Sequence, residues 1–200
     1  MWRAALGDTV DNSACGAQGC PGFRRTLCRE GTCKVPTCED VVQLGLCNLP
    51  TEAGVRARQF CPSSCGCKAP SSNLVLHLLP DGCPSSCDES AEYTAGLATL
   101  AERCEDFSHV DGPFKEFLDA LTALSTTWPE SVKFLGDNTL PAIRALGCPA
   151  LAPLRAQTGY DFCIENGTPF PTKAFAYFCP LSCGCAREAA CPFRCAGSLS

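Results

Sequence analysis

The sequence predicts a small disulfide-rich fold, mainly α-helical with irregular loops, in which two short-helix modules flank a small helical module. Three observations support this. The chain has 19 cysteines among 200 residues, the density of a disulfide scaffold. Its 17 glycines and 16 prolines suit many turns and short elements. One cysteine cluster also occurs twice, at 61–67 and 179–185. We therefore expect several small modules held by cross-links in place of one large core.

The cysteine content predicts a secreted, extracellular protein, because a reducing cytosol rarely keeps so many thiols. The N-terminal residues contain no apolar stretch of roughly 7–15 residues, so they do not match a signal peptide. We therefore expect an N-terminal truncation, or a piece of a longer chain. The alternative is a reduced intracellular zinc-binding protein. The proline and serine inside each cluster suit a helix start better than a zinc knuckle.

Charge and hydropathy exclude two classes of partner. The net charge of −5 and the isoelectric point near 5.0 lack the basic footprint that nucleic acid requires. The longest apolar run, 74–79, is far shorter than the roughly 20 residues of a membrane helix, and His77 interrupts it. We expect no nucleic-acid partner and no membrane span.

Composition and cysteine spacing divide the chain into five parts. The first shows no clear periodicity and is expected to consist of loops held by Cys15, Cys20, Cys28 and Cys33. The third begins with a proline- and serine-rich stretch that is typical of a linker. The parts are a loop segment at 1–37, a first module at 38–67, a linker at 68–82, a helical module at 83–148, and a second module with extra C-terminal cysteines at 149–200.

Within the helical module, apolar residues recur with a helical period at 93–104 and at 114–124, which predicts two amphipathic helices. The Asp-Gly-Pro sequence at 111–113 is a start signal for the second. A third, short helix is expected between Trp128 and Gly136. A fourth is a candidate at 139–147.

The repeated cluster reads Cys-Pro-Ser-Ser-Cys-Gly-Cys at 61–67 and Cys-Pro-Leu-Ser-Cys-Gly-Cys at 179–185. Its first two cysteines are four residues apart, so on a helix they share one face. Proline suits the first turn of a helix, and the glycine suits a left-handed residue that ends it. The motif therefore predicts one short helical turn that anchors three disulfides. A shorter relative, Cys-Pro-x-x-Cys, occurs at 83–87 and 191–195.

Helix geometry restricts the pairing of Cys104. Cys87 and Cys104 are separated by 17 positions, which is about 25 Å along a straight helix. Bridged Cα atoms lie within about 7 Å, so the two do not pair if the helix is continuous. Cys148 is then the nearest candidate for Cys104. This partition leaves the odd cysteine in 15–67, which agrees with an upstream truncation or reflects a free thiol or an intermolecular bridge.

The first module resembles the ShKT module, a six-cysteine fold named for a sea-anemone potassium-channel toxin. The residues that carry the resemblance are Cys-Glu-Asp at 38–40, Cys47 and the cluster at 61–67. The match is weaker at 163–185 or 148–185, and in total it covers roughly a third of the chain. It implies short helices, three disulfides per module, and a place among secreted toxins or appendages of extracellular proteins.

The resemblance also implies a pairing. Two departures from the family affect it. The gap between the last two cysteines is one residue shorter here, and the third cysteine of the family is missing between Cys47 and Cys61. Carried over by motif, the resemblance implies the bridges Cys38–Cys67 and Cys47–Cys61. Cys65 then needs another partner.

That partner of Cys65 is expected upstream of the module, at Cys33 or Cys28. The second copy lacks the opening Cys-x-Asp and adds two cysteines near the C-terminus. Its expected disulfide cysteines are Cys163, Cys179, Cys183 and Cys185, with Cys104 and Cys148 assigned to bridges of the helical module.

Motifs for catalysis are absent from the sequence: it has no His-Glu-x-x-His, no Gly-x-Ser-x-Gly and no phosphate-binding glycine loop. We therefore expect no enzyme activity, no cofactor and no metal site. His77 lies in an apolar run and is expected to be a packed core or interface residue. Asn166 begins an Asn-Gly-Thr acceptor sequence for glycosylation.

These observations predict an extracellular, disulfide-stabilised interaction or structural protein that presents rigid loops to an unknown protein, glycan or surface. The alternative is a non-catalytic accessory segment of a larger secreted enzyme. A channel-blocking toxin is a lesser alternative, because such toxins are basic and carry an adjacent Lys-Tyr pair. Here Lys173 and Tyr177 are not adjacent, and the chain is acidic.

Overall fold

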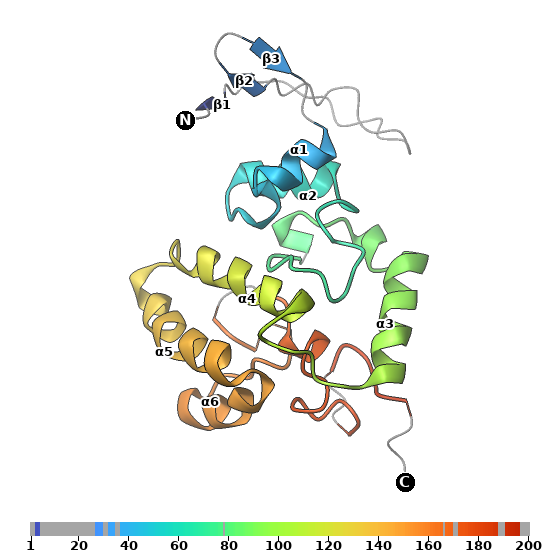
Figure 1. Cartoon of the computed structure of the whole chain (residues 1–200), viewed down its shortest axis with the longest axis vertical. Coiled ribbons are helices and arrows are strands. Elements are labelled where there is room, and N and C mark those ends of the chain that lie inside the picture. The colour runs from blue at the N-terminus through green and yellow to red at the C-terminus, as the bar shows by residue number, and fades with distance from the viewer. Residues whose placement is uncertain are drawn as a thin grey trace.

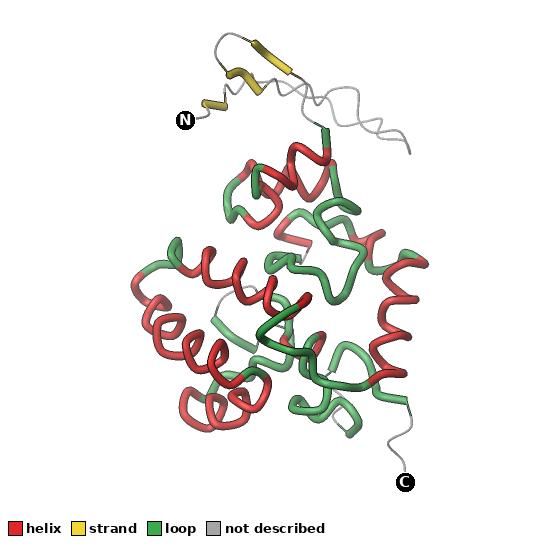
Figure 2. Tube along the Cα trace, viewed as in Figure 1, coloured by secondary structure: helices red, strands yellow, loops and turns green. Residues whose placement is uncertain are grey.

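The computed structural model of the chain describes residues 3–4, 27–29, 32–34, 37–77, 79–165, 167–169, 172–187 and 191–196. In this part of the chain a small sheet at one end precedes a set of α-helices joined by long loops (Figures 1 and 2). The α-helices are α1 (Cys38–Gln43), α2 (Glu52–Phe60), α3 (Ala91–Arg103), α4 (Gly112–Ser125), α5 (Glu130–Leu146) and α6 (Leu151–Thr158). Single 3-10 turns are η1 (Leu46–Asn48), η2 (Leu79–Asp81), η3 (Ser85–Cys87), η4 (Cys148–Ala150) and η5 (Phe175–Tyr177).

The N-terminal part, expected to consist of loops, contains three short strands. They are β1 (Arg3–Ala4), β2 (Leu27–Arg29) and β3 (Thr32–Lys34), which pair antiparallel in the order β1-β2-β3. Cys28 lies opposite Cys33 in the register of β2 and β3. The expectation missed this sheet because strands of two or three residues are too short to show a period. The other two cysteines of this part lie outside the described residues.

Helix α1 begins with a capping box. The Thr37 hydroxyl accepts a hydrogen bond from the Asp40 N–H at 3.2 Å, and the Asp40 carboxylate accepts one from the Thr37 N–H at 2.8 Å. These bonds satisfy backbone donors that a helix start leaves unpaired. The acidic residue two positions after Cys38 therefore has a local structural role.

Helix α2 carries a buried arginine. The side chain of Arg58 is 1% exposed, and its guanidinium donates to the backbone carbonyls of Cys47, Leu49 and Asp81. Burial lowers the pKa of Arg58, and the nearby Asp81 carboxylate partly offsets that shift. These carbonyl contacts join α2 to the loops on either side, because a buried guanidinium requires acceptors for its donors.

The repeated cysteine cluster forms the same turn twice. In both copies the second cysteine N–H donates to the first cysteine carbonyl, and the third cysteine N–H donates to the proline carbonyl, all at 2.8–2.9 Å. Gly66 and Gly184 have positive φ values of 85° and 71°. These bonds define a Schellman-type ending of a single helical turn, so the predicted turn and its left-handed glycine are confirmed.

Disulfides connect these turns to the rest of the fold, and both turns follow one pattern. The first cysteine of a turn pairs with the first upstream cysteine of its copy, the second pairs with the next, and the third pairs downstream. Seven bridges join described residues: Cys38–Cys61, Cys47–Cys65, Cys67–Cys83, Cys104–Cys195, Cys148–Cys179, Cys163–Cys183 and Cys185–Cys191.

The pairing implied for the first module is therefore corrected. Cys38 pairs with Cys61 in place of Cys67, and Cys47 pairs with Cys65, which removes the need for a partner at position 28 or 33. The reason is the left-handed glycine, which reverses the chain after the second cysteine. Cys67 consequently pairs downstream, with Cys83.

The candidate pairing of Cys104 with Cys148 is also corrected. Cys104 pairs with Cys195, and Cys148 pairs with Cys179. Cys104 ends α3 with a φ of 38°, and the C-terminal segment returns alongside this helix end, where the Ala196 N–H donates to the Ala101 carbonyl at 2.8 Å. The bridge follows from this backbone contact.

The third and fourth predicted helices are one helix, α5, which runs from Glu130 to Leu146. Gly136 was expected to end a helix, but it lies inside α5, where a Cβ atom would stand 2.8 Å from a ring carbon of Trp128. Its small size admits the indole ring. Pro141 removes one backbone hydrogen bond, yet the helix continues because Leu140 and Ile143 are buried in the core.

Two hydrophobic clusters form the interior. The smaller one joins the first cysteine module to buried residues of 74–87, and the larger one joins the central helices to the second module. In the larger cluster, rings of α4 stack on rings near the second turn: Phe114 lies 5.3 Å and Phe117 4.7 Å from Phe178 between ring centroids. The expected linker, 68–82, is also part of the interior, because 74–77 are buried.

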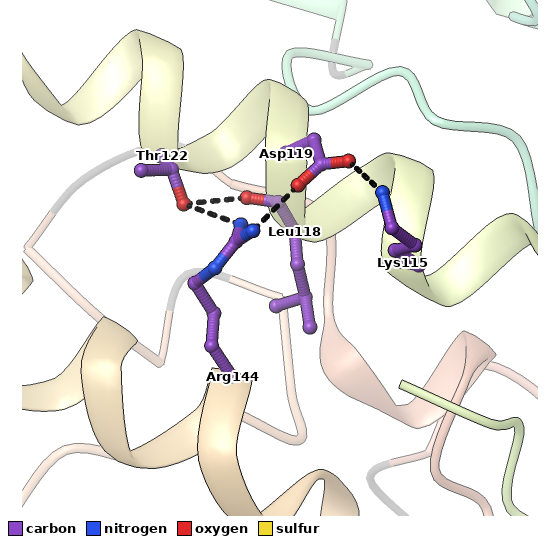
Figure 3. Close-up of polar contacts among 5 residues, drawn as sticks. All are labelled: Lys115, Leu118, Asp119, Thr122 and Arg144. Atoms are coloured by element: carbon purple, nitrogen blue, oxygen red, sulfur yellow. Dashed lines mark hydrogen bonds and ion pairs between the residues drawn. The ribbon is translucent and has the colours of Figure 1, made fainter. Parts of the chain in front are cut away.

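A polar network fixes α4 against α5 on the surface (Figure 3). Arg144 of α5 donates to Asp119 at 2.7 Å and to Thr122 at 3.1 Å on α4, and Lys115 donates to Asp119 at 2.6 Å. Hydrogen bonds from Lys115 and Arg144 lower the pKa of Asp119. These side chains are exposed, so the network orients the helix pair more than it stabilises the fold.

The turn glycines give a stability prediction. In Gly66→Ala, alanine would have to adopt the left-handed backbone conformation of Gly66. Its Cβ atom would also lie 2.7 Å from the Ser72 Cβ atom. Gly45 has a φ of 65° but open space around it, so Gly45→Ala isolates the conformational effect. We expect Gly45→Ala to lower the free energy of unfolding by about 1–2 kcal/mol and Gly66→Ala by about 2–4 kcal/mol. Urea unfolding of the oxidised proteins measures both. Equal losses would contradict the role of the Ser72 contact.

Candidate functional site

The disulfide cysteines expected from the sequence lie in the bridges given above, so they form the frame of the molecule. Cys179 and Cys185 have no exposed surface, and Cys67 and Cys148 are each 2% exposed. Such buried sulfurs position loops but contact no ligand directly. Asn166, the glycosylation candidate, lies outside the described residues.

Cys87 is the cysteine that has no bridge in the described part of the chain. It is 1% exposed, and burial raises the pKa of its thiol. A buried, protonated thiol is a poor nucleophile. The sequence argument placed the odd cysteine in 15–67, whereas this unpaired thiol belongs to the predicted helical module. The difference arises because bridges such as Cys67–Cys83 cross the predicted module boundaries.

A pocket of about 480 Å³ lies beside the Cys163–Cys183 bridge. One wall is a single face of α6, because residues four apart on a helix lie above one another. Gly159 ends α6 with a φ of 75°, and the chain turns back to form the opposite wall. The lining residues are Leu151, Ala152, Arg155, Ala156, Gly159, Asp161, Phe162, Cys163, Ser182 and Cys183.

An ion pair forms the polar edge of this pocket. Arg155 Nη1 lies 3.0 Å from Asp161 Oδ2, and the other carboxylate oxygen of Asp161 accepts from the Cys163 N–H at 3.0 Å. The Asp161 side chain is 17% exposed, whereas that of Arg155 is 63% exposed. A backbone hydrogen bond therefore positions Asp161, which pairs with the more exposed arginine at the pocket edge.

Asp106 fixes the wall formed by the second cysteine turn. Its carboxylate accepts hydrogen bonds from the Leu181 N–H at 2.9 Å, the Ser182 N–H at 3.2 Å and the Ser182 hydroxyl at 2.5 Å. These are the unpaired donors at the start of the helical turn. The corresponding Ser63 and Ser64 of the first turn are exposed, and no described side chain caps them. The two turns thus have the same backbone conformation, but only the second is capped by a described side chain.

A buried polar cluster lies between the two modules. His77 is 8% exposed, as expected for a packed core residue, and its Nε2 lies 3.4 Å from the Glu165 carboxylate. The Tyr177 ring packs edge-on against His77, and the Tyr177 hydroxyl hydrogen-bonds that of Tyr93 at 2.9 Å. His77 Nδ1 and Glu165 Oε2 have no hydrogen-bond partner in the described structure.

Burial controls the charges in this cluster. It lowers the pKa of His77 to about 3, with a further decrease from the positive charge of Lys173, so the imidazole is neutral at pH 7. Burial also raises the pKa of Glu165. The contact between the two is therefore not an ion pair at neutral pH.

Lys173 spans the two modules and is 1% exposed. Its Nζ donates to the Ser72 carbonyl at 3.1 Å and to the Ser72 hydroxyl at 2.9 Å, while its backbone N–H donates to the Val75 carbonyl at 2.9 Å. Burial lowers the pKa of Lys173 to about 7, and Glu165 partly offsets that shift. The hydrogen-bond partners of Lys173 are backbone carbonyls and a hydroxyl of the chain itself, which is typical of a structural contact between packed segments.

A second pocket of about 280 Å³ lies between the first module and α4, where Leu49 and Pro50 face Ala120 and Leu124. Its lining is almost entirely apolar. Within the described ranges, no group of three or more His, Cys, Asp or Glu side chains is placed to hold a metal ion. No helix of the described chain is both long enough and apolar enough to cross a bilayer.

Comparison with protein-family models, with curated proteins and with solved structures gives no match to this chain. The resemblance of 38–67 to the ShKT module therefore stays a prediction from motif spacing.

Sequence reasoning missed the pocket at α6. Arg155 and Asp161 lie on opposite sides of a helix end and match no motif, and Asp106 is 75 residues from the backbone N–H that it caps. The one usable signal was Gly159, because a glycine after a helical stretch predicts a chain reversal. A reversal alone does not show which side chains it brings together.

The Asp106 cap predicts a local loss of stability. In Asp106→Ala, the start of the second turn loses its acceptor, and we expect the free energy of unfolding to fall by about 1–2 kcal/mol. Glu105→Ala is the matched control, since Glu105 is exposed and pairs with the exposed Arg103. Its effect is expected to stay below about 0.5 kcal/mol. Chemical unfolding compares the two, and a similar loss in both would show that the cap contributes nothing.

The buried imidazole predicts a pH dependence of stability. The pKa of His77 is about 3 in the folded chain and 6.5 ordinarily, so between these values the unfolded chain binds the additional proton. Stability from this group is complete above pH 6.5 and falls as the pH decreases toward 3, with a slope of up to about 1.4 kcal/mol per pH unit. Burial raises the pKa of Glu165, so the stability from that group decreases as the pH rises. This contribution is expected in the natural protein and in a variant without His77.

His77→Gln removes this titration. We expect the stability of the natural protein to fall more steeply than that of His77→Gln between pH 6.5 and pH 4. Urea unfolding at a series of pH values measures both slopes. Parallel curves would mean that the ring binds its proton over the same pH range in the folded and the unfolded chain, which contradicts a lowered pKa of His77.

Proposed function

We propose that the chain is an extracellular, disulfide-stabilised interaction protein that presents rigid loops to a protein, a glycan or a surface. The seven bridges carry this proposal, because a reducing cytosol would keep most of these cysteines as thiols. Each bridge stabilises the fold by roughly 2–4 kcal/mol, chiefly by restricting the unfolded chain.

The distribution of the bridges supports rigid presentation of loops. Cys67–Cys83, Cys104–Cys195 and Cys148–Cys179 each join two of the parts expected from the sequence. Loops between such bridges lose little additional entropy when a partner binds them. This is the property that a small binding scaffold requires.

The proposal assigns no catalytic role to the described residues. Lys173 donates to Ser72, and His77 lies 3.4 Å from the Glu165 carboxylate. Burial favours the neutral form of all three titratable groups. Their arrangement is typical of a structural polar cluster, which positions the segments around it.

Thiol counting tests the proposal. Native protein, isolated with its thiols trapped by acid, is denatured without reductant, alkylated, and analysed by mass spectrometry and for bound zinc. We expect few free thiols, with Cys87 among them, and peptides linked as Cys38–Cys61 and Cys47–Cys65. Cys87→Ser provides the control, since it should remove one thiol from the count. Nearly complete alkylation together with bound zinc would overturn the proposal.

A further inference from the structure

The pocket beside the Cys163–Cys183 bridge has a preformed shape. Its volume of about 480 Å³ falls within the roughly 300–1,000 Å³ of small-molecule sites. The bridge joins the loop wall to the turn wall, and Asp106 fixes the turn from outside the pocket. A ligand would therefore meet walls that need little ordering.

The polar groups of the pocket are balanced in charge and in hydrogen bonding. The guanidinium of Arg155 has five N–H donors, and in the described structure its partner is Asp161. One Asp161 oxygen accepts the Cys163 N–H and the other forms the ion pair with Arg155, so both oxygens retain lone pairs for a further donor. The Ser182 hydroxyl donates to Asp106, so its own lone pairs remain acceptors. The pocket edge thus offers both donors and acceptors, and its two charges neutralise each other.

The remaining lining of the pocket is mostly apolar. Ala152 and Ala156 are adjacent positions on one face of α6, and their methyl groups leave space that longer side chains would fill. The buried side chains of Leu151 and Phe162 add to this apolar lining. A ligand that suits this site has hydroxyls on its edge and carbon–hydrogen bonds on its face.

We propose that this pocket binds a neutral sugar unit of a glycan, which rests on the proposed extracellular interaction function and names its ligand class. A pyranose combines ring hydroxyls, each both donor and acceptor, with an apolar C–H face. A free anion is less suited, because the arginine that would bind it is already paired with Asp161 at 3.0 Å. The site therefore favours neutral polyhydroxyl compounds over small ions.

The test is a titration of the full, oxidised chain with methyl glycosides of glucose, galactose, mannose and N-acetylglucosamine. Binding is measured by the changes in amide chemical shifts in NMR spectra. We expect at least one glycoside to give saturable shifts at α6 and the loop that follows it. Ala152→Trp fills the pocket and should weaken that binding by at least about tenfold. Gln157→Trp, on the same exposed helix but outside the lining, should leave it unchanged.

Three results would overturn the proposal. They are an absence of saturable shifts with all four glycosides at tens of millimolar, equal effects of the two tryptophan variants, and saturation of the same signals by acetate or sulfate. A thiol count on the same sample separates the two proposals. An oxidised protein that binds no sugar contradicts the sugar site alone, whereas a reduced, zinc-bound protein contradicts the extracellular function itself.

Discussion

The left-handed glycine of each Cys-Gly-Cys turn is the constraint on which the disulfide framework depends. With φ values of 85° at Gly66 and 71° at Gly184, the chain reverses between two cysteines that only this glycine separates. A side chain at this position would oppose that reversal. Two sulfurs of each turn consequently point back to their own module, and the third reaches forward along the chain. Without the reversal, neither module could make bridges in both directions.

The forward and backward bridges explain why the predicted modules are not independent. The second turn lies against the aromatic side chains of α4, where Phe117 and Phe178 approach within 4.7 Å between ring centroids. Two bridges then fix the C-terminal part to the ends of the central helices. Burial of these rings stabilises by roughly 2 kcal/mol each, comparable with one bridge. The larger core therefore needs both the aromatic contacts and the cross-links.

Local features of the fold could be predicted from the sequence, whereas the disulfide pairing could not. Cysteine spacing and glycine predicted the helical turns, and apolar periodicity predicted α3 and α4. Gly136 was misleading because its effect depends on the distant contact with Trp128. The partner of Cys104 depends on where the C-terminus returns, which no local pattern encodes. The pocket at α6 was unpredictable for the same reason, since its walls bring α6 and the loop after it together with the separate second cysteine turn.

The two copies of the turn differ in the chain that they enclose, and this difference accounts for the pocket. The bridge from Cys38 spans 23 positions, whereas its counterpart from Cys148 spans 31. The next bridge changes little between copies, from 18 to 20 positions. The extra length of the second copy therefore lies mostly between its two upstream cysteines, Cys148 and Cys163, where α6 and the loop after Gly159 form. Because longer loops add little entropic cost once a bridge closes them, this copy can enclose a cavity with the same disulfide pattern.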